Sequence, residues 1–236
     1  MSGEREVCDE FKLYGLTAAE CEKRLDKLGV DGCTVIGDGA DIKVAFTYDK
    51  KDAAIYGDIE QRFLIEFSSE VYALRDVTLK EQLVDLLKIN GIVMSAAESF
   101  TGGGLSAAVT SVPGASKVFY EGIVAYSEIA KNRRLGVRKE TLEKYKPVSA
   151  ETAAEMAEGL LKAGCTDIGV STTGIAGPSS DDSGFPVGLC FIGVSYMGET
   201  EVYRYEFAGD RAAIVRKGID SAMFRAIKFI TRGVIR

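Results

Sequence analysis

Ser95-Ala-Ala-Glu-Ser99-Phe-Thr-Gly-Gly-Gly104 is the segment that most clearly indicates the order of strands and helices in this chain. A short apolar run, 91–94, precedes it, and a run typical of a helix, 105–110, follows it. This order predicts a buried strand that ends at Glu98 and Ser99 and a helix that begins near Gly102. Such a turn presents a hydroxyl and free backbone N–H groups at the end of a strand, and glycines let an anion approach them. The alternative is a simple helix start, in which Ser99 or Thr101 is only an N-cap.

Strands and helices alternate on both sides of this stretch. The alternation predicts an α/β fold with a three-layer αβα arrangement, in which the sheet is mixed, mostly parallel and completed by an antiparallel pair. The predicted strands lie at 91–97, 121–126, 167–172, 188–196 and 200–207. One predicted helix begins at residue 78. The others span 102–111, 127–134, 139–145, 149–163 and 210–231.

The sequence predicts two domains. Residues 1–75 are expected to form a separate small α+β domain, and residues 76–236 are expected to form the α/β domain. In the first, Thr17 and Glu20 have the spacing of a capping box at the start of a helix. Two short strands, 34–36 and 42–46, flank a glycine turn at 37–39. That turn lacks the GxxG spacing of nucleic-acid-binding KH modules and contains an acid, which favours a packing role.

Composition limits the classes of function. The chain has 236 residues, 29 basic and 35 acidic, and its net charge of −6 argues against a general binder of nucleic-acid backbones. A small anionic substrate needs only one local positive pocket. No apolar run approaches the roughly 18 residues of a membrane span, and the first residues do not resemble a secretory signal. Five scattered cysteines without a CxxC motif indicate reduced thiols, so we expect a cytoplasmic protein without a membrane segment.

The chain contains no histidine. A Ser-His-Asp or Cys-His catalytic group therefore cannot be built from one copy, and histidine-containing zinc sites are excluded as well. Any acyl-transfer chemistry must use a lysine, a carboxylate or a tyrosine as its base.

Four segments fall where a sheet of this kind binds ligands, at the carboxyl ends of strands or at a helix start. They contribute Ser99, then Tyr126 and Lys131, then Thr173 and Gly174, and finally Arg211 at the start of the last helix. A lysine acts as a base near neutral pH only if burial or a neighbouring cation lowers its pKa from about 10.4. Lys131 in that state would activate a hydroxyl such as that of Ser99.

A rival arrangement uses Ser127, which lies four residues before Lys131 on the same predicted helix face. Tyr126 either orients the base, stacks on a ring or packs in a strand. The cation of Arg211 is unfavourable at a helix start, which hints at a ligand or a buried acid nearby. No dinucleotide-binding, P-loop or paired-acid metal motif is present in the sequence.

Taken together, these segments resemble the competence/damage-inducible CinA family, and most closely its C-terminal nicotinamide mononucleotide amidohydrolase domain. The order and spacing of the family's motifs are kept over about residues 80–232. The matching segments are 98–103, 112–116, 126–131, 135–137, 147–149, 173–178, 186–188 and 209–211. A weaker similarity to the KH-like middle region of full-length members covers 71–74 and the leucine-rich helix after it.

The resemblance implies a serine amidohydrolase that removes ammonia from the carboxamide of nicotinamide mononucleotide without a metal or cofactor. It implies a small-molecule nucleotide as the partner, and a homodimer or a larger homo-oligomer. It also assigns roles to individual positions. Ser99 would be the nucleophile, Lys131 the general base and Tyr126 a neighbour of the ring or the lysine, while Glu98, Thr101, Gly102, Gly103, Thr173, Gly174 and Arg211 would surround the carbonyl oxygen or the polar end of the substrate.

Three positions depart from the family pattern. Phe100 replaces a cysteine, Glu128 replaces the asparagine of YSN, and Phe185 replaces a lysine that commonly precedes PVG. These departures favour a second hypothesis, a catalytically silent nucleotide-binding or regulatory module. A third hypothesis, a nucleic-acid-binding accessory protein, is disfavoured by the acidic net charge.

Overall fold

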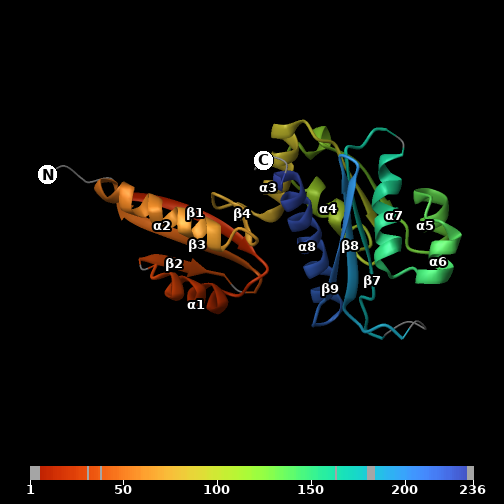
Figure 1. Ribbon diagram of the computed structural model, residues 1–236. Coiled ribbons are helices and arrows are strands. Elements are labelled where there is room, and N and C mark those ends of the chain that lie inside the picture. The colour runs from red at the N-terminus through yellow and green to blue at the C-terminus, as the bar shows by residue number, and fades with distance from the viewer. Residues whose placement is uncertain (1–5, 31, 38, 163, 180–183, 233–236) are drawn as a thin grey trace. The chain divides into compact units, whose positions relative to one another are not determined.

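The computed structural model describes residues 6–30, 32–37, 39–162, 164–179 and 184–232. The chain divides into two compact units, Met1–Thr78 and Leu79–Arg236. Each unit has its own sheet and its own buried core (Figure 1). Within the described ranges, no helix is both long enough and apolar enough to cross a membrane.

The N-terminal unit is a four-stranded antiparallel sheet in the order β2-β3-β1-β4, packed with two helices. Its strands are β1 (Glu6–Tyr14), β2 (Cys33–Ile36), β3 (Asp41–Asp49) and β4 (Val71–Ala73). Its helices are α1 (Ala18–Leu28) and α2 (Ala53–Glu66), the latter preceded by a 3-10 turn, η1 (Lys50–Asp52). A cluster of buried phenylalanines fills the core, namely Phe11, Phe46, Phe63 and Phe67.

The predicted capping box is confirmed. The Thr17 hydroxyl accepts a hydrogen bond from the backbone N–H of Glu20, and the Glu20 carboxylate accepts one from the N–H of Thr17. These bonds satisfy donors that a helix start otherwise leaves unpaired. The predicted turn at 37–39 includes Asp38, which lies outside the described residues.

The C-terminal unit contains a five-stranded sheet in the order β6-β5-β7-β8-β9. Its strands are β5 (Met94–Glu98), β6 (Phe119–Val124), β7 (Ile168–Gly174), β8 (Leu189–Tyr196) and β9 (Glu199–Glu206). Strands β5, β6 and β7 are parallel, whereas β7 with β8 and β8 with β9 are antiparallel. Four strands therefore run in one direction and β8 alone runs in the other, which confirms the mixed, mostly parallel sheet with its antiparallel pair.

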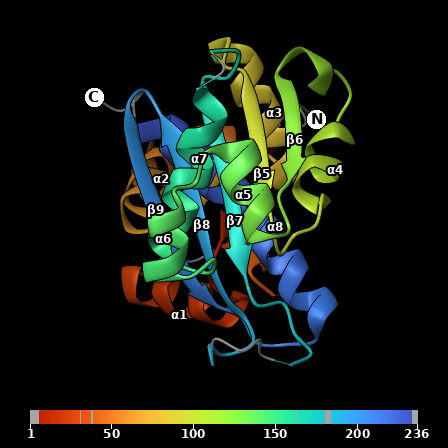
Figure 2. The same cartoon turned by 90° about the vertical axis from the view of Figure 1, so that its right-hand side faces the viewer.

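Helices cover both faces of this sheet (Figures 1 and 2). One layer contains α3 (Leu79–Asn90), α4 (Gly104–Thr110) and α8 (Arg211–Arg232). The other contains α5 (Glu128–Leu135), α6 (Lys139–Tyr145) and α7 (Ala150–Leu161). A short 3-10 turn, η2 (Ala115–Lys117), precedes β6. The predicted three-layer α/β class is confirmed.

Within the C-terminal unit, the largest difference from the predicted boundaries is at β5, which begins at Met94 instead of residue 91. Gly91 has a positive φ of 65°, and the N–H of Ile92 still donates to the carbonyl of Leu87. This left-handed residue ends α3, so the chain leaves the helix before it joins the sheet.

The register of the parallel strands creates the site. Glu98 of β5 is paired with Val124 of β6 on one side and with Thr172 of β7 on the other. Because all three strands end at the same edge, the segments that follow them lie together, as ligand sites of α/β sheets require.

Candidate active site

A pocket of about 490 Å³ opens at this edge of the C-terminal sheet. Its walls come from the segments after β5, β6 and β7, from the loop before α7 and from the first residue of α8. The lining residues are Ser99, Phe100, Tyr126, Ser127, Glu128, Lys131, Pro147, Val148, Gly174, Ile175, Ala176, Gly177, Ser179 and Arg211.

Ser99 and Lys131 meet inside the pocket. The Lys131 Nζ lies 2.8 Å from the Ser99 Oγ, although the two residues are far apart in the sequence. The lysine side chain is almost completely buried, with 2% of its surface exposed, and Ser99 is 7% exposed. Burial lowers the pKa of Lys131 from 10.5 to about 8, an effect that the nearby carboxylate of Glu128 partly opposes. The pair therefore combines a hydroxyl with an amine that loses its proton at mildly alkaline pH.

Ser127 does not pair with the lysine in this way. Its hydroxyl accepts a hydrogen bond from the N–H of Ala130 and caps α5. The same cap orients α5 so that Lys131, one turn further along, points to Ser99. The structure thus gives Ser127 a structural role and pairs the lysine with Ser99.

Glu98 holds the turn together from within. It is fully buried, and its carboxylate accepts hydrogen bonds from the N–H groups of Gly103, Leu105 and Ser106. The hydroxyls of Thr101 and Ser106 donate to it as well. Glu98 therefore caps the start of α4 and lies outside the pocket lining, in contrast to its predicted place around the substrate.

Thr101, Gly102 and Gly103 also differ from their predicted role as donors to a carbonyl oxygen. The N–H of Gly102 donates to the carbonyl of Ser99, and that of Gly103 donates to Glu98. The Thr101 hydroxyl is occupied by Glu98 and by the Thr172 hydroxyl. These groups are used inside the protein, and none of the three residues lines the pocket.

Backbone conformation explains two of the three glycines, and helix packing explains the third. Gly102 and Gly103 have φ values of 60° and 98°, a region that residues with a Cβ adopt only at a cost. Gly104 packs against α8, where a Cβ would lie 2.5 Å from the Ile219 side chain. The run of three glycines is thus explained by turn conformation and helix packing.

Arg211 and Tyr126 form the rim of the pocket. The Arg211 guanidinium donates to the Gly177 carbonyl and, over 3.3 Å, to the Tyr126 hydroxyl. Tyr126 follows β6 and is 63% exposed, so strand packing does not explain it. This contact between two segments accounts for an arginine at the start of α8, where the helix dipole disfavours it.

The two residues predicted after the third strand have different positions. Thr173 is fully buried, and its hydroxyl donates to the carbonyl of Pro147 over 2.7 Å. Gly174 lines the pocket, and a Cβ at that position would collide with Cys190. Gly174 therefore forms part of the site, while Thr173 holds the neighbouring wall in place.

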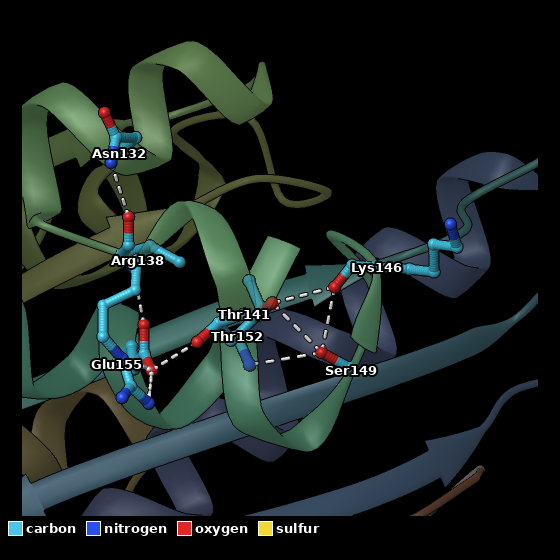
Figure 3. A network of polar contacts seen from close by, with 8 residues as sticks. Asn132, Arg138, Thr141, Lys146, Ser149, Thr152 and Glu155 are labelled. Atoms are coloured by element: carbon cyan, nitrogen blue, oxygen red, sulfur yellow. Dashed lines mark hydrogen bonds and ion pairs between the residues drawn. The ribbon is translucent and has the colours of Figure 1, made fainter. Parts of the chain in front are cut away.

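That wall consists of Pro147 and Val148, which were not among the predicted site residues. A polar network behind it fixes the loop (Figure 3). The hydroxyls of Ser149 and Thr152 both donate to the Lys146 carbonyl, over 3.0 and 2.8 Å. The Pro-Val-Ser segment, 147–149, is one of the matching motifs, and it was the signal that could have placed this loop in the site.

A second part of the network links α6 to α7. The Glu155 carboxylate accepts hydrogen bonds from the backbone and guanidinium of Arg138 and from the Thr141 hydroxyl. These charge-assisted bonds lower the pKa of Glu155 against the opposing effect of its partial burial. They join the start of α6 to α7.

Comparison with known proteins agrees with this architecture. Residues 76–230 match the model of the CinA C-terminal domain. The chain belongs to the CinA family.

Curated CinA relatives are similar over most of this chain. A CinA-like protein of Kosmotoga olearia is 41% identical over 196 residues, which are 82% of this chain and 47% of that protein. A putative competence-damage inducible protein of Caldicellulosiruptor saccharolyticus is 35% identical over 221 residues, which are 90% of this chain and 54% of that protein. The chain thus spans about half the length of these relatives.

Solved CinA structures share the fold. A CinA superfamily protein of Klebsiella pneumoniae has a TM-score of 0.64 at 31% identity, and the match covers 65% of this chain and 96% of that one. The competence/damage inducible protein CihA of Agrobacterium tumefaciens has a TM-score of 0.61 at 32% identity. That match covers 64% of this chain and 92% of the other.

The departures from the CinA pattern have distinct surroundings. Phe100 lines the pocket but is only 4% exposed, because its ring packs against Ala176, Cys190 and Ile214. Phe185 packs behind the pocket on the cluster that contains Val148. The first two of the three positions, Phe100 and Glu128, therefore lie in the pocket lining of this CinA domain, and Phe185 supports the wall.

Proposed function

We propose that the chain is an amidohydrolase that converts nicotinamide mononucleotide to nicotinate mononucleotide and ammonia by a Ser-Lys mechanism. The observation that carries the proposal is the 2.8 Å contact between the Lys131 Nζ and the Ser99 Oγ in a buried position. The lowered pKa of the lysine and the membership of the CinA family support it. Cytoplasmic nucleotide salvage and a homo-oligomeric state belong to the same proposal.

The uncharged amine of Lys131 accepts the proton of Ser99 as the Oγ attacks the carboxamide carbon. The tetrahedral intermediate then collapses, and the lysine gives that proton to the nitrogen, which leaves as ammonia. A water molecule, deprotonated by the same amine, attacks the resulting ester. The carboxylate product and the free Ser99 hydroxyl complete the cycle.

The residue after the nucleophile is the proposed donor to the oxyanion. The N–H of Ser99 itself is used by the Thr172 carbonyl. Within the described part of the chain, the N–H of Phe100 makes no hydrogen bond, and Phe100 lines the pocket. A backbone donor held in this place is worth roughly 3–4 kcal/mol of transition-state stabilisation. At the rim, Arg211 would bind the phosphate of the nucleotide.

The test is ammonia release from nicotinamide mononucleotide by the native chain and by Ser99→Ala and Lys131→Ala. We expect a loss of at least about a hundredfold in each variant, which is typical of a missing general base. Ser111→Ala and Lys139→Ala are matched controls, because both lie outside the pocket lining, on the surface, and should retain native rates.

Two outcomes would contradict the mechanism. Native rates in both variants would exclude the pair as catalytic groups. An inactive native chain that still binds the nucleotide would instead support the silent module, for which Phe100 and Glu128 in the pocket are the specific observations.

A further inference from the structure

Glu128 introduces a carboxylate into the pocket at a place that the catalytic steps do not use. It is the first residue of α5, is exposed and lies three residues before Lys131 on the same helix. Both side chains line the pocket, so Glu128 lies within one helical turn of the amine that would act on the carboxamide.

Within the described residues, Glu128 makes no salt bridge and no side-chain hydrogen bond. The other ionisable side chains of the lining are Lys131, Tyr126 and Arg211. Lys131 bonds to Ser99, and Arg211 bonds to Gly177 and Tyr126. Glu128 also borders the neighbouring groove, which Arg133, Lys139 and Glu143 line, so its exposed carboxylate lies at the boundary between the groove and the pocket.

We infer that Glu128 makes the site selective for a carboxamide on a positively charged ring. This inference rests on the proposed function, since nicotinamide mononucleotide has its carboxamide on a cationic pyridinium ring. A carboxylate close to the reacting group lowers the free energy of a cationic ring and not that of a neutral one. Arg211 would serve the anionic tail, so the two ends of a zwitterionic substrate would meet opposite charges.

The same carboxylate has a cost for catalysis. It opposes the effect of burial and keeps the pKa of Lys131 higher than burial alone would set it. At neutral pH this reduces the fraction of the lysine that is uncharged. Removal of Glu128 should therefore weaken the binding of a cationic ring and, at the same time, make the base available at lower pH.

Binding is measured in the Ser99→Ala background, so that no turnover intervenes. The probes are nicotinamide mononucleotide and its reduced form, which keeps the carboxamide and the phosphate but has a neutral ring. We expect Glu128→Gln to weaken the binding of the cationic form by about fivefold, the size of one partly exposed ion pair, and to leave the neutral form unchanged. Glu128→Asp should keep part of the preference.

Glu143→Gln on α6 is the matched control, because Glu143 is exposed and lines a neighbouring groove but not this pocket. It should leave both dissociation constants unchanged. An equal change for the two ligands, or no change for either, would overturn the inference. If neither ligand binds to Ser99→Ala, the proposed substrate itself fails, and that result is distinct from a loss of selectivity.

A second measurement tests the effect on the lysine. In the native background, the pH at which kcat/KM reaches half of its plateau should be lower in Glu128→Gln than in the native chain, whereas Glu143→Gln should match the native profile. An unchanged profile together with unchanged selectivity would show that Glu128 is a solvated surface residue.

Discussion

At the scale of single residues, the burial of one amine determines the chemistry and also affects stability. Lys131 is held beside Ser99 in a site that disfavours its charged form, and its pKa falls to about 8. Near pH 7 about one molecule in ten then has the uncharged amine, compared with fewer than one in a thousand for an ordinary lysine. The folded state is destabilised as a result, because most molecules carry a charged ammonium group in a buried position at neutral pH.

Lys131→Met should stabilise the C-terminal unit at neutral pH. The folded pKa of about 8 lies below the unfolded value of 10.5, so between these limits the unfolded chain binds a proton that the folded chain does not. Native stability therefore increases as pH rises from 8 to 10.5, and the variant lacks this increase. Below pH 8 we expect an advantage of about 1–3 kcal/mol for the variant, which disappears above pH 10.5.

Urea unfolding at pH 7, 9 and 10.5 measures this difference in the free energy of unfolding. Lys139→Met serves as the control, since that lysine is exposed at the start of α6. Its effect on the free energy of unfolding should not change with pH. A variant that is less stable than the native chain at pH 7 would contradict the argument.

At the scale of elements, α8 supports the site from two positions. Its first residue, Arg211, reaches the rim, and Gly218, two turns later, gives room to Phe100. A Cβ on Gly218 would collide with the Cζ of the Phe100 ring, far inside van der Waals contact. The bulky residue that replaces the family cysteine thus fits because this helix has no side chain opposite it.

Gly218→Ala should destabilise the C-terminal unit by about 1–3 kcal/mol, the usual cost of overpacking in a core. It should also lower the proposed activity, because the ring is part of the residue next to the nucleophile. The double variant Gly218→Ala with Phe100→Cys should recover most of both losses. Thermal unfolding measures the stability of the native chain and the variants, and ammonia release measures their activity.

Gly57→Ala in α2 is the matched control, since a Cβ at that position meets no atom within 4 Å. It should be neutral or stabilise by up to about 1 kcal/mol, as expected for alanine in a helix. Equal effects of the two substitutions, or no recovery in the double variant, would argue against the steric explanation.

The observed helices and strands show which local features were predictable from the sequence. The strand end at Glu98 and Ser99 and the capping box of Thr17 were predictable, because local patterns determine them. The inward position of the Glu98 carboxylate was not predictable, since it depends on where the turn returns to its own strand. Helix α2 was missed because its apolar residues Ile55 and Ile65 are exposed, so no single buried stripe marks it.

At the scale of the whole molecule, the two units should respond to pH in opposite directions. The C-terminal unit gains stability as Lys131 loses its proton. In the N-terminal unit, Glu60 is partly buried close to the carboxyl of Asp9, which accepts a hydrogen bond from Tyr48, and within the described residues the Glu60 Oε1 has no hydrogen-bond partner. Burial and this neighbour raise the pKa of Glu60 from 4.5 to about 7.

Glu60→Gln should remove this pH dependence. Because the folded pKa lies above the unfolded value, the contribution of Glu60 is fully present below pH 4.5 and is lost as pH rises through 7. At pH 8 the variant should therefore be more stable than the native chain in this unit. Hydrogen exchange of β1 and β3 measures the unit separately, with Glu22→Gln on the exposed side of α1 as control. Identical exchange of native and Glu60→Gln chains from pH 5 to 8 would contradict the expectation.

The three glycines after Ser99 have a consequence for how members of this family are recognised. Their presence follows from left-handed turn residues and from the close approach of α8, and neither depends on catalysis. A relative that has lost its nucleophile or its base but keeps the same turn should therefore keep Gly102 and Gly103. The glycine motif thus reports the conformation of the turn, while the residue at position 131 is the one to inspect when activity is assigned.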